Sequence, residues 1–84
     1  MQKKLITVSV RNRQGLLYSG QVVTVSSWNK KGPFDVLVDH ANFISTIYKK
    51  MVMKYEDGKV EEIKVDSGLL QVYQNQVVVF LGIV

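Results

Sequence analysis

Apolar and polar residues alternate along several short stretches of the chain. In residues 5–11, Ile6, Val8 and Val10 fall on one side, and only polar residues lie between them. A period of two residues is typical of a β-strand with one buried face. Fifteen of the 84 residues are valine, and β-branched side chains of this kind pack well on a pleated sheet. The pattern therefore predicts an all-β fold.

The same pattern divides the chain into short strands separated by polar or glycine-containing turns. The predicted strands are residues 5–11, 16–18, 21–27, 34–38, 41–48, 51–55, 60–65, 69–73 and 76–81. The predicted turns are residues 12–15, 28–31, 39–40, 49–50, 56–59, 66–68 and 74–75. Residues 41–48 could also form one helical turn, but we favour a strand because most of their side chains favour sheets. Gly20 inside a strand pattern indicates a bulge or a close backbone approach.

Length and composition place the chain among small single domains. Eighty-four residues are enough for one modest hydrophobic core, so we predict a single domain spanning residues 1–84. Cysteine is absent from the sequence, which excludes disulfides and thiolate metal sites. No apolar run is long enough for a membrane span, and none follows the basic residues 1–4 as a signal peptide would require. Short strands at close spacing predict a sandwich or a barrel.

Residues 32–45 differ in composition from the rest of the chain. They hold the only proline, Pro33, the only histidine, His40, and two of the three phenylalanines. Because proline fixes φ and lacks an N–H, Gly32-Pro33 marks a turn before a short strand. Asp39 tolerates unusual backbone angles, so Asp39-His40 is expected to bend the chain. This corner would fix how two parts of the sheet stack.

The chain is basic, with a net charge of +4 and an isoelectric point of about 9.5. This favours acidic partners such as nucleic acid, anionic lipid or an acidic protein surface. Two clusters mix lysines with aromatic residues: Trp28 with Lys30 and Lys31, and Tyr48 with Lys49, Lys50, Lys54 and Tyr55. An alternative function is therefore a small basic β-barrel that binds single-stranded nucleic acid. The same residues also suit a protein-docking edge, and we favour a solvated, mildly basic surface.

Candidate catalytic chemistry is sparse. Asp35, Asp39 and His40 form the only cluster of acids with an imidazole, so a hydrolase or metal enzyme would have to use them. Asp39 and His40 are neighbours and would point to opposite faces of a strand. Ser19 and Ser67 each precede a glycine but lack the full Gly-x-Ser-x-Gly pattern. We expect Asp39 to cap the corner, His40 to lie at a surface or interface, and no catalytic, cofactor-binding or metal-binding residue.

Three segments together resemble a known family. Residues 17–25 (Leu-Tyr-Ser-Gly-Gln-Val-Val-Thr-Val) are similar to the aromatic-Ser/x-Gly-x-Val strand of the epsilon subunit of F-type ATP synthase. Residues 32–41 resemble that family's Gly-x-Phe/Leu-x-Ile/Val-Leu-x-x-His-Ala block. Residues 66–72, followed by Asn75, resemble its Ser-Gly-Gly-x-Leu-x-Val hairpin. The segments occur in the family's order and spacing and cover nearly the whole chain.

The resemblance implies a two-layer β-sandwich of mostly antiparallel strands. It also implies a non-catalytic central-stalk (rotor) subunit that docks on the gamma subunit and the c-ring and couples proton translocation to ATP synthesis. Carried over by position, Lys31, Pro33 and His40 would contact the c-ring and stalk, and Ala41 and Phe43 would contact gamma. The chain would lie peripherally at the cytoplasmic face of a bacterial plasma membrane and reach the membrane only through the complex. It would have no cofactor and no nucleic-acid partner.

The chain also departs from the family's pattern. Lys50 stands where the family usually has glycine, and Ser67-Gly68 stands where it usually has two glycines, so these turns must be built differently. Family members usually continue into a helical hairpin that can inhibit ATP hydrolysis and in some cases binds ATP. Because the sequence stops at Val84, we expect no inhibitory arm and no nucleotide site.

Overall fold

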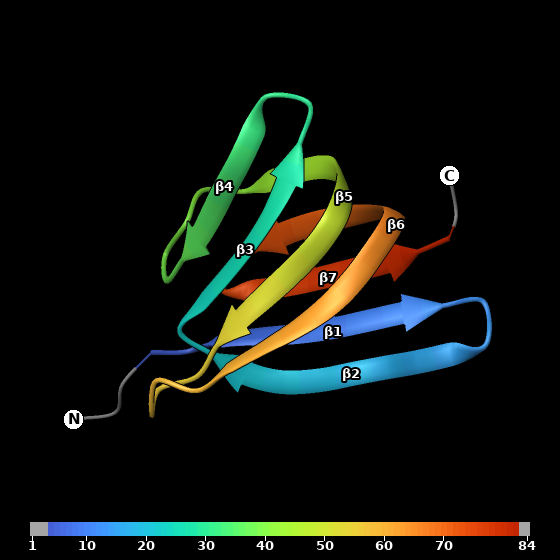
Figure 1. Ribbon diagram of the computed structural model, residues 1–84. Coiled ribbons are helices and arrows are strands. Elements are labelled where there is room, and N and C mark those ends of the chain that lie inside the picture. The colour runs from blue at the N-terminus through green and yellow to red at the C-terminus, as the bar shows by residue number, and fades with distance from the viewer. Residues whose placement is uncertain (1–3, 83–84) are drawn as a thin grey trace.

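The computed structural model describes residues 4–82, and this part of the chain contains seven strands. They are β1 (Ile6–Asn12), β2 (Gly15–Val22), β3 (Thr24–Asn29), β4 (Gly32–Leu37), β5 (Phe43–Lys54), β6 (Val60–Tyr73) and β7 (Gln76–Leu81) (Figure 1). The expected ends of the domain, residues 1–3 and 83–84, lie outside the described residues. No helix that could cross a membrane occurs between residues 4 and 82. The all-β prediction is confirmed.

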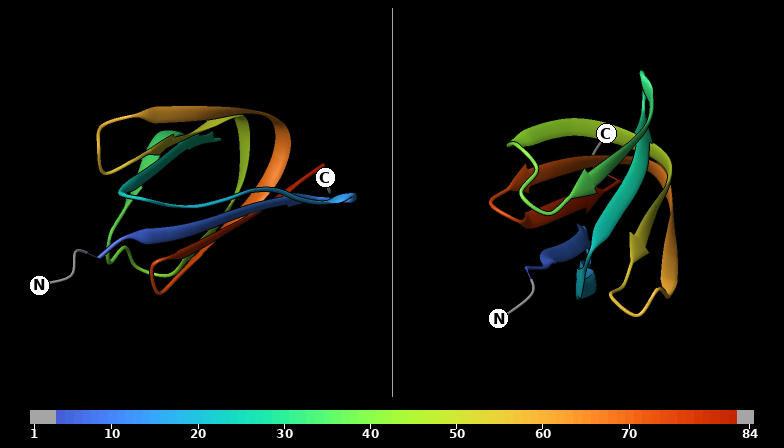
Figure 2. Two further views of the ribbon diagram at one scale, coloured as in Figure 1. Left: turned by 90° about the horizontal axis from the view of Figure 1, so that it is seen from below. Right: turned by 90° about the vertical axis from the view of Figure 1, so that its left-hand side faces the viewer.

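The strands form one hydrogen-bonded sheet in the order β2-β1-β7-β6-β5-β3-β4. All neighbouring pairs are antiparallel except β1 and β7, which run parallel. The sheet curves over on itself, so that its β1–β7 part and its β3–β5 part enclose a common core (Figure 2). This is the two-layer sandwich of mostly antiparallel strands that the resemblance implied. In the described part of the chain β2 and β4 are the two edges, so the closed barrel of the nucleic-acid alternative is not formed.

A single hydrophobic core fills the space between the two layers. In β1 the alternation places Ile6, Val8 and Val10 in this core, as predicted. Every strand contributes to it, and its other buried apolar members are Val22, Val25, Val36, Ile47, Met51, Met53, Val65, Leu70, Val72, Val77 and Val79. Ser27 is buried with them, and its hydroxyl donates a hydrogen bond of 2.8 Å to the Lys50 carbonyl. Packing of mostly β-branched side chains therefore fixes how the layers stack.

Two predicted turns, residues 49–50 and 66–68, are instead bends within the continuous strands β5 and β6. The strands pair at Ile47–Gly68 and again at Lys49–Val65, so one residue of β5 faces two residues of β6. β5 is also bulged against β3, because Lys49, Lys50 and Met51 stand opposite the single residue Ser27, and Lys49 has a φ of 76°. Gly68 lies so close to its neighbours that an added Cβ would stand 2.9 Å from Leu81 Cδ2 and 3.1 Å from the Phe80 carbonyl oxygen. The bend carries both strands from one layer to the other without interrupting their pairing.

Two other predicted boundaries are wrong. Residues 21–27 do not form one strand, because the chain leaves β2 after Val22 and enters β3 at Thr24. Between them the Val23 amide donates to the Lys54 carbonyl at 2.8 Å, which turns the chain into the other layer. β5 begins at Phe43, two residues later than predicted. The structure confirms a strand over residues 43–48, and the alternative of a helical turn is not formed there.

Gly20 is not the site of the bulge, and the group that approaches it closely is a side chain and not another backbone segment. The register between β1 and β2 shifts at Leu17, which lies between the Arg11–Leu16 and Val10–Tyr18 pairs. At Gly20, an added Cβ would stand 2.6 Å from the Tyr18 hydroxyl. The glycine therefore makes room for the tyrosine side chain.

Candidate functional site

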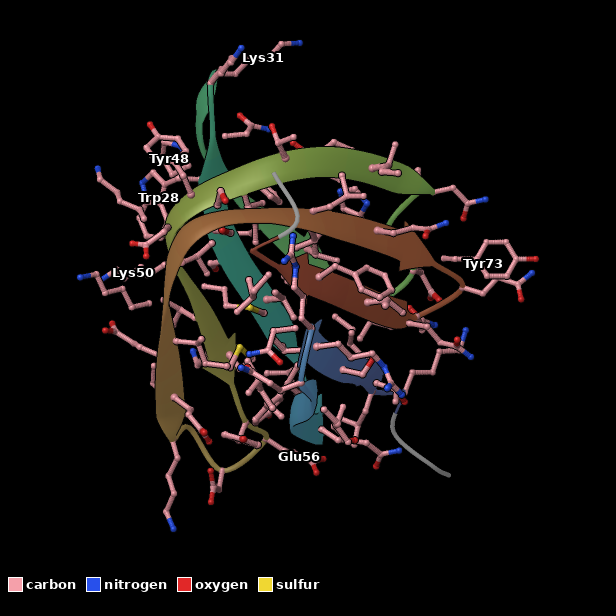
Figure 3. All side chains as sticks on the ribbon, turned by 90° about the vertical axis from the view of Figure 1, so that its right-hand side faces the viewer. Trp28, Lys31, Tyr48, Lys50, Glu56 and Tyr73 are labelled. Atoms are coloured by element: carbon pink, nitrogen blue, oxygen red, sulfur yellow. The ribbon has the colours of Figure 1, made fainter. Side chains whose placement is uncertain are left out.

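The predicted contact residues lie on or directly beside the two loops at the ends of β4. Lys31 belongs to the Lys30-Lys31 turn between β3 and β4, and Pro33 follows it on β4 with an exposed side chain. The Asn29 side chain fixes this turn, because its Oδ1 accepts a hydrogen bond from the Lys31 amide at 2.9 Å. Its Nδ2 donates to Ser45 Oγ at 3.1 Å, which ties the turn to the start of β5. Figure 3 shows Lys31 at the outer end of this hairpin.

The loop between β4 and β5 is held by a pair of side-chain amide and carboxylate groups. Asp39 has a φ of 64°, which confirms the predicted bend. Its backbone amide donates to Asn75 Oδ1 at 2.6 Å, and Asn75 Nδ2 donates back to Asp39 Oδ1 at 3.0 Å. The Asn75 carbonyl also accepts from the Thr7 amide at 2.9 Å. One asparagine therefore joins this loop to the β6–β7 turn and to β1.

The Asp39 carboxylate is stabilised in its charged form. The hydrogen bond from Asn75 is the main reason that the pKa of Asp39 lies below its ordinary value of 3.8, and Lys4 contributes through its Nζ, 3.3 Å from Oδ2. Desolvation opposes these effects but does not reverse them. Asp39 therefore stays ionised at neutral pH and fixes the loop, as expected for a cap.

His40 packs against the aromatic pair Phe34–Phe43. Its ring nitrogen bonds to a backbone carbonyl and not to Asp35 or Asp39. Its Nδ1–H donates to the Ala41 carbonyl at 2.7 Å, and its ring lies edge-on to Phe43 with the centroids 5.7 Å apart. Phe43 in turn lies edge-on to Phe34 at 5.4 Å. Ala41 is exposed beside this group. The imidazole is thus held at the surface, as predicted.

A shallow depression lies beside the β3–β4 turn. It lies between the β3–β4 turn and the start of β5, and its lining residues are Asn29, Lys30, Lys31, Phe43, Ile44, Ser45 and Thr46. Lys31 and Phe43, assigned from the resemblance to different partners, therefore line one hollow, and His40 adjoins it through Phe43. Pro33 and Ala41 are exposed but are not among its lining residues. Of the predicted contact residues, the depression therefore brings Lys31 and Phe43 together.

Sequence reasoning missed two exposed apolar residues next to this surface. Ile44 is 62% exposed, and with Phe43 and Tyr73 it lines a second depression on the outer side of β5 and β6. Figure 3 shows Tyr73 on the side of the molecule away from Lys31, Tyr48 and Lys50. The one available signal was the adjacent pair Phe43-Ile44, because strand alternation must turn one of two neighbouring apolar residues outward.

The two lysine–aromatic clusters of the sequence are only partly joined. Trp28 pairs directly with Tyr48 across β3 and β5, and the ammonium groups of Lys49 and Lys50 both lie 5.7 Å from the centroid of the Trp28 ring. Tyr55, which the sequence grouped with them, lies beyond the end of β5 at the β5–β6 turn. Lysines and aromatics therefore gather on the outer face of β3 and β5 near the bend.

Tyr55 closes the opposite end of the sandwich. Its hydroxyl donates to Glu61 Oε1 at 2.9 Å and, having only one proton, accepts from the Tyr18 hydroxyl at 2.5 Å. The Tyr18 hydrogen bond is the main reason that the pKa of Tyr55 is raised above its ordinary value of 10.0. This cluster links β2 to the β5–β6 hairpin. The Tyr55 hydroxyl stays protonated and uncharged over the physiological pH range.

The acid–imidazole cluster considered for catalysis is dispersed. Asp35 lies on the outer face of β4, where its Oδ1 accepts a hydrogen bond of 2.5 Å from Ser26 Oγ. Asp39 is engaged by Asn75 and Lys4, and His40 by Ala41. Among residues 4–82, no three histidine or acidic side chains are grouped so that they could hold a metal ion.

Comparisons with known proteins give a consistent family. The model of the family described as "ATP synthase, Delta/Epsilon chain, beta-sandwich domain" matches residues 5–82. An ATP synthase epsilon chain of Sulfurimonas denitrificans is 23% identical over 77 residues, covering 90% of this chain and 59% of that relative. An epsilon chain of Nitratiruptor sp. is 33% identical over 64 residues, covering 75% and 50% respectively. The chain thus spans little more than half the length of these curated relatives.

Solved structures share the fold at low sequence identity. A chain in the Euglena gracilis mitochondrial ATP synthase structure of OSCP, F1 and the c-ring superposes with a TM-score of 0.84 at 18% identity, over 92% of this chain and 50% of that one. A chain in the central stalk and c-ring structure of the Tetrahymena thermophila mitochondrial ATP synthase gives a TM-score of 0.74 at 8% identity, over 96% and 66%.

Proposed function

The chain belongs to the family of ATP synthase delta/epsilon β-sandwich domains, and we propose that it is a non-catalytic central-stalk subunit of an F-type ATP synthase. In this role it docks on the gamma subunit and the c-ring and helps to couple proton translocation to ATP synthesis. The observation that carries the proposal is the family match over residues 5–82, which spans all seven strands. The complex would hold the chain peripherally at the cytoplasmic face of a bacterial plasma membrane.

The surface at the two ends of β4 is the proposed docking region. Lys31, Pro33 and His40 are proposed to contact the c-ring and stalk, and Ala41 and Phe43 to contact gamma. The depression that Lys31 and Phe43 line together supports this proposal, because residues assigned to different partners share one hollow and could meet two neighbouring subunits at their junction. A transmitter of torque needs rigidity, and close-packed β layers supply it. The Asn75–Asp39 hydrogen bonds hold the His40 loop on this rigid body.

Co-purification from native membranes tests the proposal. The full chain with an affinity tag should recover the gamma and c subunits of the ATP synthase in constant ratio. Phe43→Ala should weaken the recovery of gamma, because it removes the ring between Phe34 and His40. Lys59→Gln, at the distant β5–β6 turn, is the matched control and should recover both subunits normally. Isolation of the intact native complex without this chain would refute the proposed role.

A further inference from the structure

One face of the molecule gathers lysines around a tryptophan. We call it the lysine–tryptophan face, and its members are Trp28, Lys30, Lys31, Tyr48, Lys49 and Lys50. Trp28 pairs with Pro33 on β4 and with Tyr48 on β5, so the three side chains form a row across the outer side of three strands. Figure 3 shows Lys31, Tyr48, Trp28 and Lys50 along the same side of the molecule.

Two lysines of this face, Lys49 and Lys50, have contacts that hold them beside Trp28. The buried Ser27 hydroxyl donates to the Lys50 carbonyl, and the ammonium groups of Lys49 and Lys50 each lie 5.7 Å from the centroid of the Trp28 ring. Cation–π contacts of this kind orient the ammonium groups while their charge stays available to solvent. The positive charge of these two lysines is therefore held beside the Trp28 ring.

The charges on this face are only partly neutralised from within. Lys50 pairs with Glu62 at 3.2 Å, and Lys64 lies opposite Lys50 across β5 and β6 and adds another cation. In the part of the chain that the structure describes, Lys30, Lys31 and Lys49 have no carboxylate within ion-pair distance. The face therefore carries a net positive charge that an anionic partner can complement.

The side chains distinguish between anionic partners. Single-stranded nucleic acid is held by bases stacked on open aromatic rings, but the Trp28 ring already has two ammonium groups beside it. All the cations of the face are lysines, which act as point charges and lack the planar fork that arginine offers to a specific phosphate or carboxylate. Lysine stems with tryptophan and tyrosine are the combination that lies at the headgroup level of membranes.

We propose that the lysine–tryptophan face binds the headgroups of anionic phospholipids at a membrane surface. The negative surface potential of an anionic leaflet attracts each lysine within a Debye length. Tyr48, the more exposed aromatic of the pair, meets the headgroup region with its hydroxyl directed to water. This goes beyond the stalk role, because it adds a contact with lipid, and of the lysines of the face only Lys31 is also a proposed contact of the c-ring.

Vesicle binding by the full chain tests the inference directly. The chain is mixed with vesicles of phosphatidylcholine alone or of phosphatidylcholine with phosphatidylglycerol, and the bound fraction is measured by sedimentation. Trp28 is the only tryptophan in the chain, so its fluorescence reports on this face alone. We expect binding only to the phosphatidylglycerol vesicles, with a change in Trp28 emission, and release by salt.

A pair of charge-matched variants locates the contact. Lys30→Gln with Lys49→Gln removes two cations from the face and neither from the proposed gamma and c-ring contacts. Arg11→Gln with Arg13→Gln removes the same charge from the end of β1 and its turn. Each lysine near an anionic surface is worth about fivefold in affinity, so the first variant should bind roughly 25-fold more weakly. The arginine variant should lose only a small part of that.

Three results would overturn the inference. They are no binding to phosphatidylglycerol vesicles at low salt, an equal loss in the two double variants, and binding to a single-stranded oligonucleotide with the same lysine dependence but none to vesicles. The assay contains neither the gamma subunit nor the c-ring. Its failure therefore leaves the co-purification result untouched, and failure to recover gamma and the c-ring leaves the vesicle result untouched.

Discussion

The bend in β5 and β6 and the loop between β4 and β5 both redirect the chain, but different interactions hold them. At the bend, Gly68 lies against Leu81 and Ile47, and the buried Ser27 hydroxyl binds the Lys50 carbonyl. At the loop, the exposed Asp39 is held by Asn75 and by an ion pair with Lys4. Packing fixes the bend, whereas charge and polar hydrogen bonds at the surface fix the loop.

The difference bears on the two proposals. The lysine–tryptophan face is carried by the bend, so its geometry should be insensitive to pH and salt even though its binding is not. His40, Ala41 and Phe43 are carried by the loop or directly follow it, so their positions depend on the ionisation of Asp39. Substitutions at the bend should therefore lower the stability of the fold, whereas substitutions at the loop should mainly change the local order of His40, Ala41 and Phe43.

Gly68→Ala should have the largest effect on stability. The new Cβ would stand 2.9 Å from Leu81 Cδ2, 3.1 Å from the Phe80 carbonyl oxygen and 3.3 Å from Ile47 Cγ1. Because backbone as well as side chains must move, we expect a loss of about 1–3 kcal/mol in the free energy of unfolding. Urea unfolding measures it. Thr46→Ala, on the exposed side of β5 near the bend, is the control, and equal stability of the two variants would contradict the packing account.

Ser27→Ala should come next, with a loss of about 1 kcal/mol. The serine is fully buried among apolar residues, and its hydroxyl serves the Lys50 carbonyl at the bend. Removing it should also alter Trp28 fluorescence, because Lys49 and Lys50 are then less firmly placed. Ser26→Ala, the neighbour whose hydroxyl faces outward to Asp35, should cost less. A larger loss of stability in Ser26→Ala than in Ser27→Ala would contradict the expectation that the buried hydrogen bond contributes more than the exposed one.

Much of the fold could be predicted from the sequence, but the bend could not. Alternation places Ile6, Val8 and Val10 in the core, and the Asp57-Gly58 pair marks a real hairpin. Lys49-Lys50 and residues 66–68 have the composition of turns, yet their strands remain paired on both sides. Whether a glycine ends a strand or lets it pass close to a neighbour depends on residues far along the chain. For Gly68 those residues are Phe80 and Leu81.

The candidate site was predicted residue by residue but not as an arrangement. The resemblance selected Lys31 and His40 as contacts of the c-ring and stalk, and Phe43 as a contact of gamma. Their arrangement depends on the Asn29–Ser45 hydrogen bond and on the edge-on contact of His40 with Phe43, which no local pattern encodes. The contact of Trp28 with Lys49 and Lys50 likewise requires the pairing of β3 with β5.

The loop should respond to acid, whereas the bend should not. The pKa of Asp39 is lowered in the folded chain, so its contribution to stability is present above the unfolded pKa near 3.8 and is lost as pH falls through the folded value. Asp39→Asn should therefore differ most from the parent at neutral pH and approach it in acid. Urea unfolding across this pH range measures the convergence. Asn75→Gly, which keeps the left-handed backbone but removes the amide, should flatten the profile as well, and unchanged profiles in both variants would contradict the assignment.

Glu62→Gln should have the smallest effect on stability, and it separates charge from packing at the bend. The Lys50–Glu62 pair is solvated, with side chains 41% and 55% exposed, so its loss should change the unfolding free energy by less than about 0.5 kcal/mol. The same change frees Lys50 and should strengthen binding to phosphatidylglycerol vesicles. Asp57→Asn, at the β5–β6 turn, changes the net charge equally and should leave vesicle binding almost unaltered. A stability loss as large as that of Ser27→Ala would show that surface charge, and not buried packing, holds the bend.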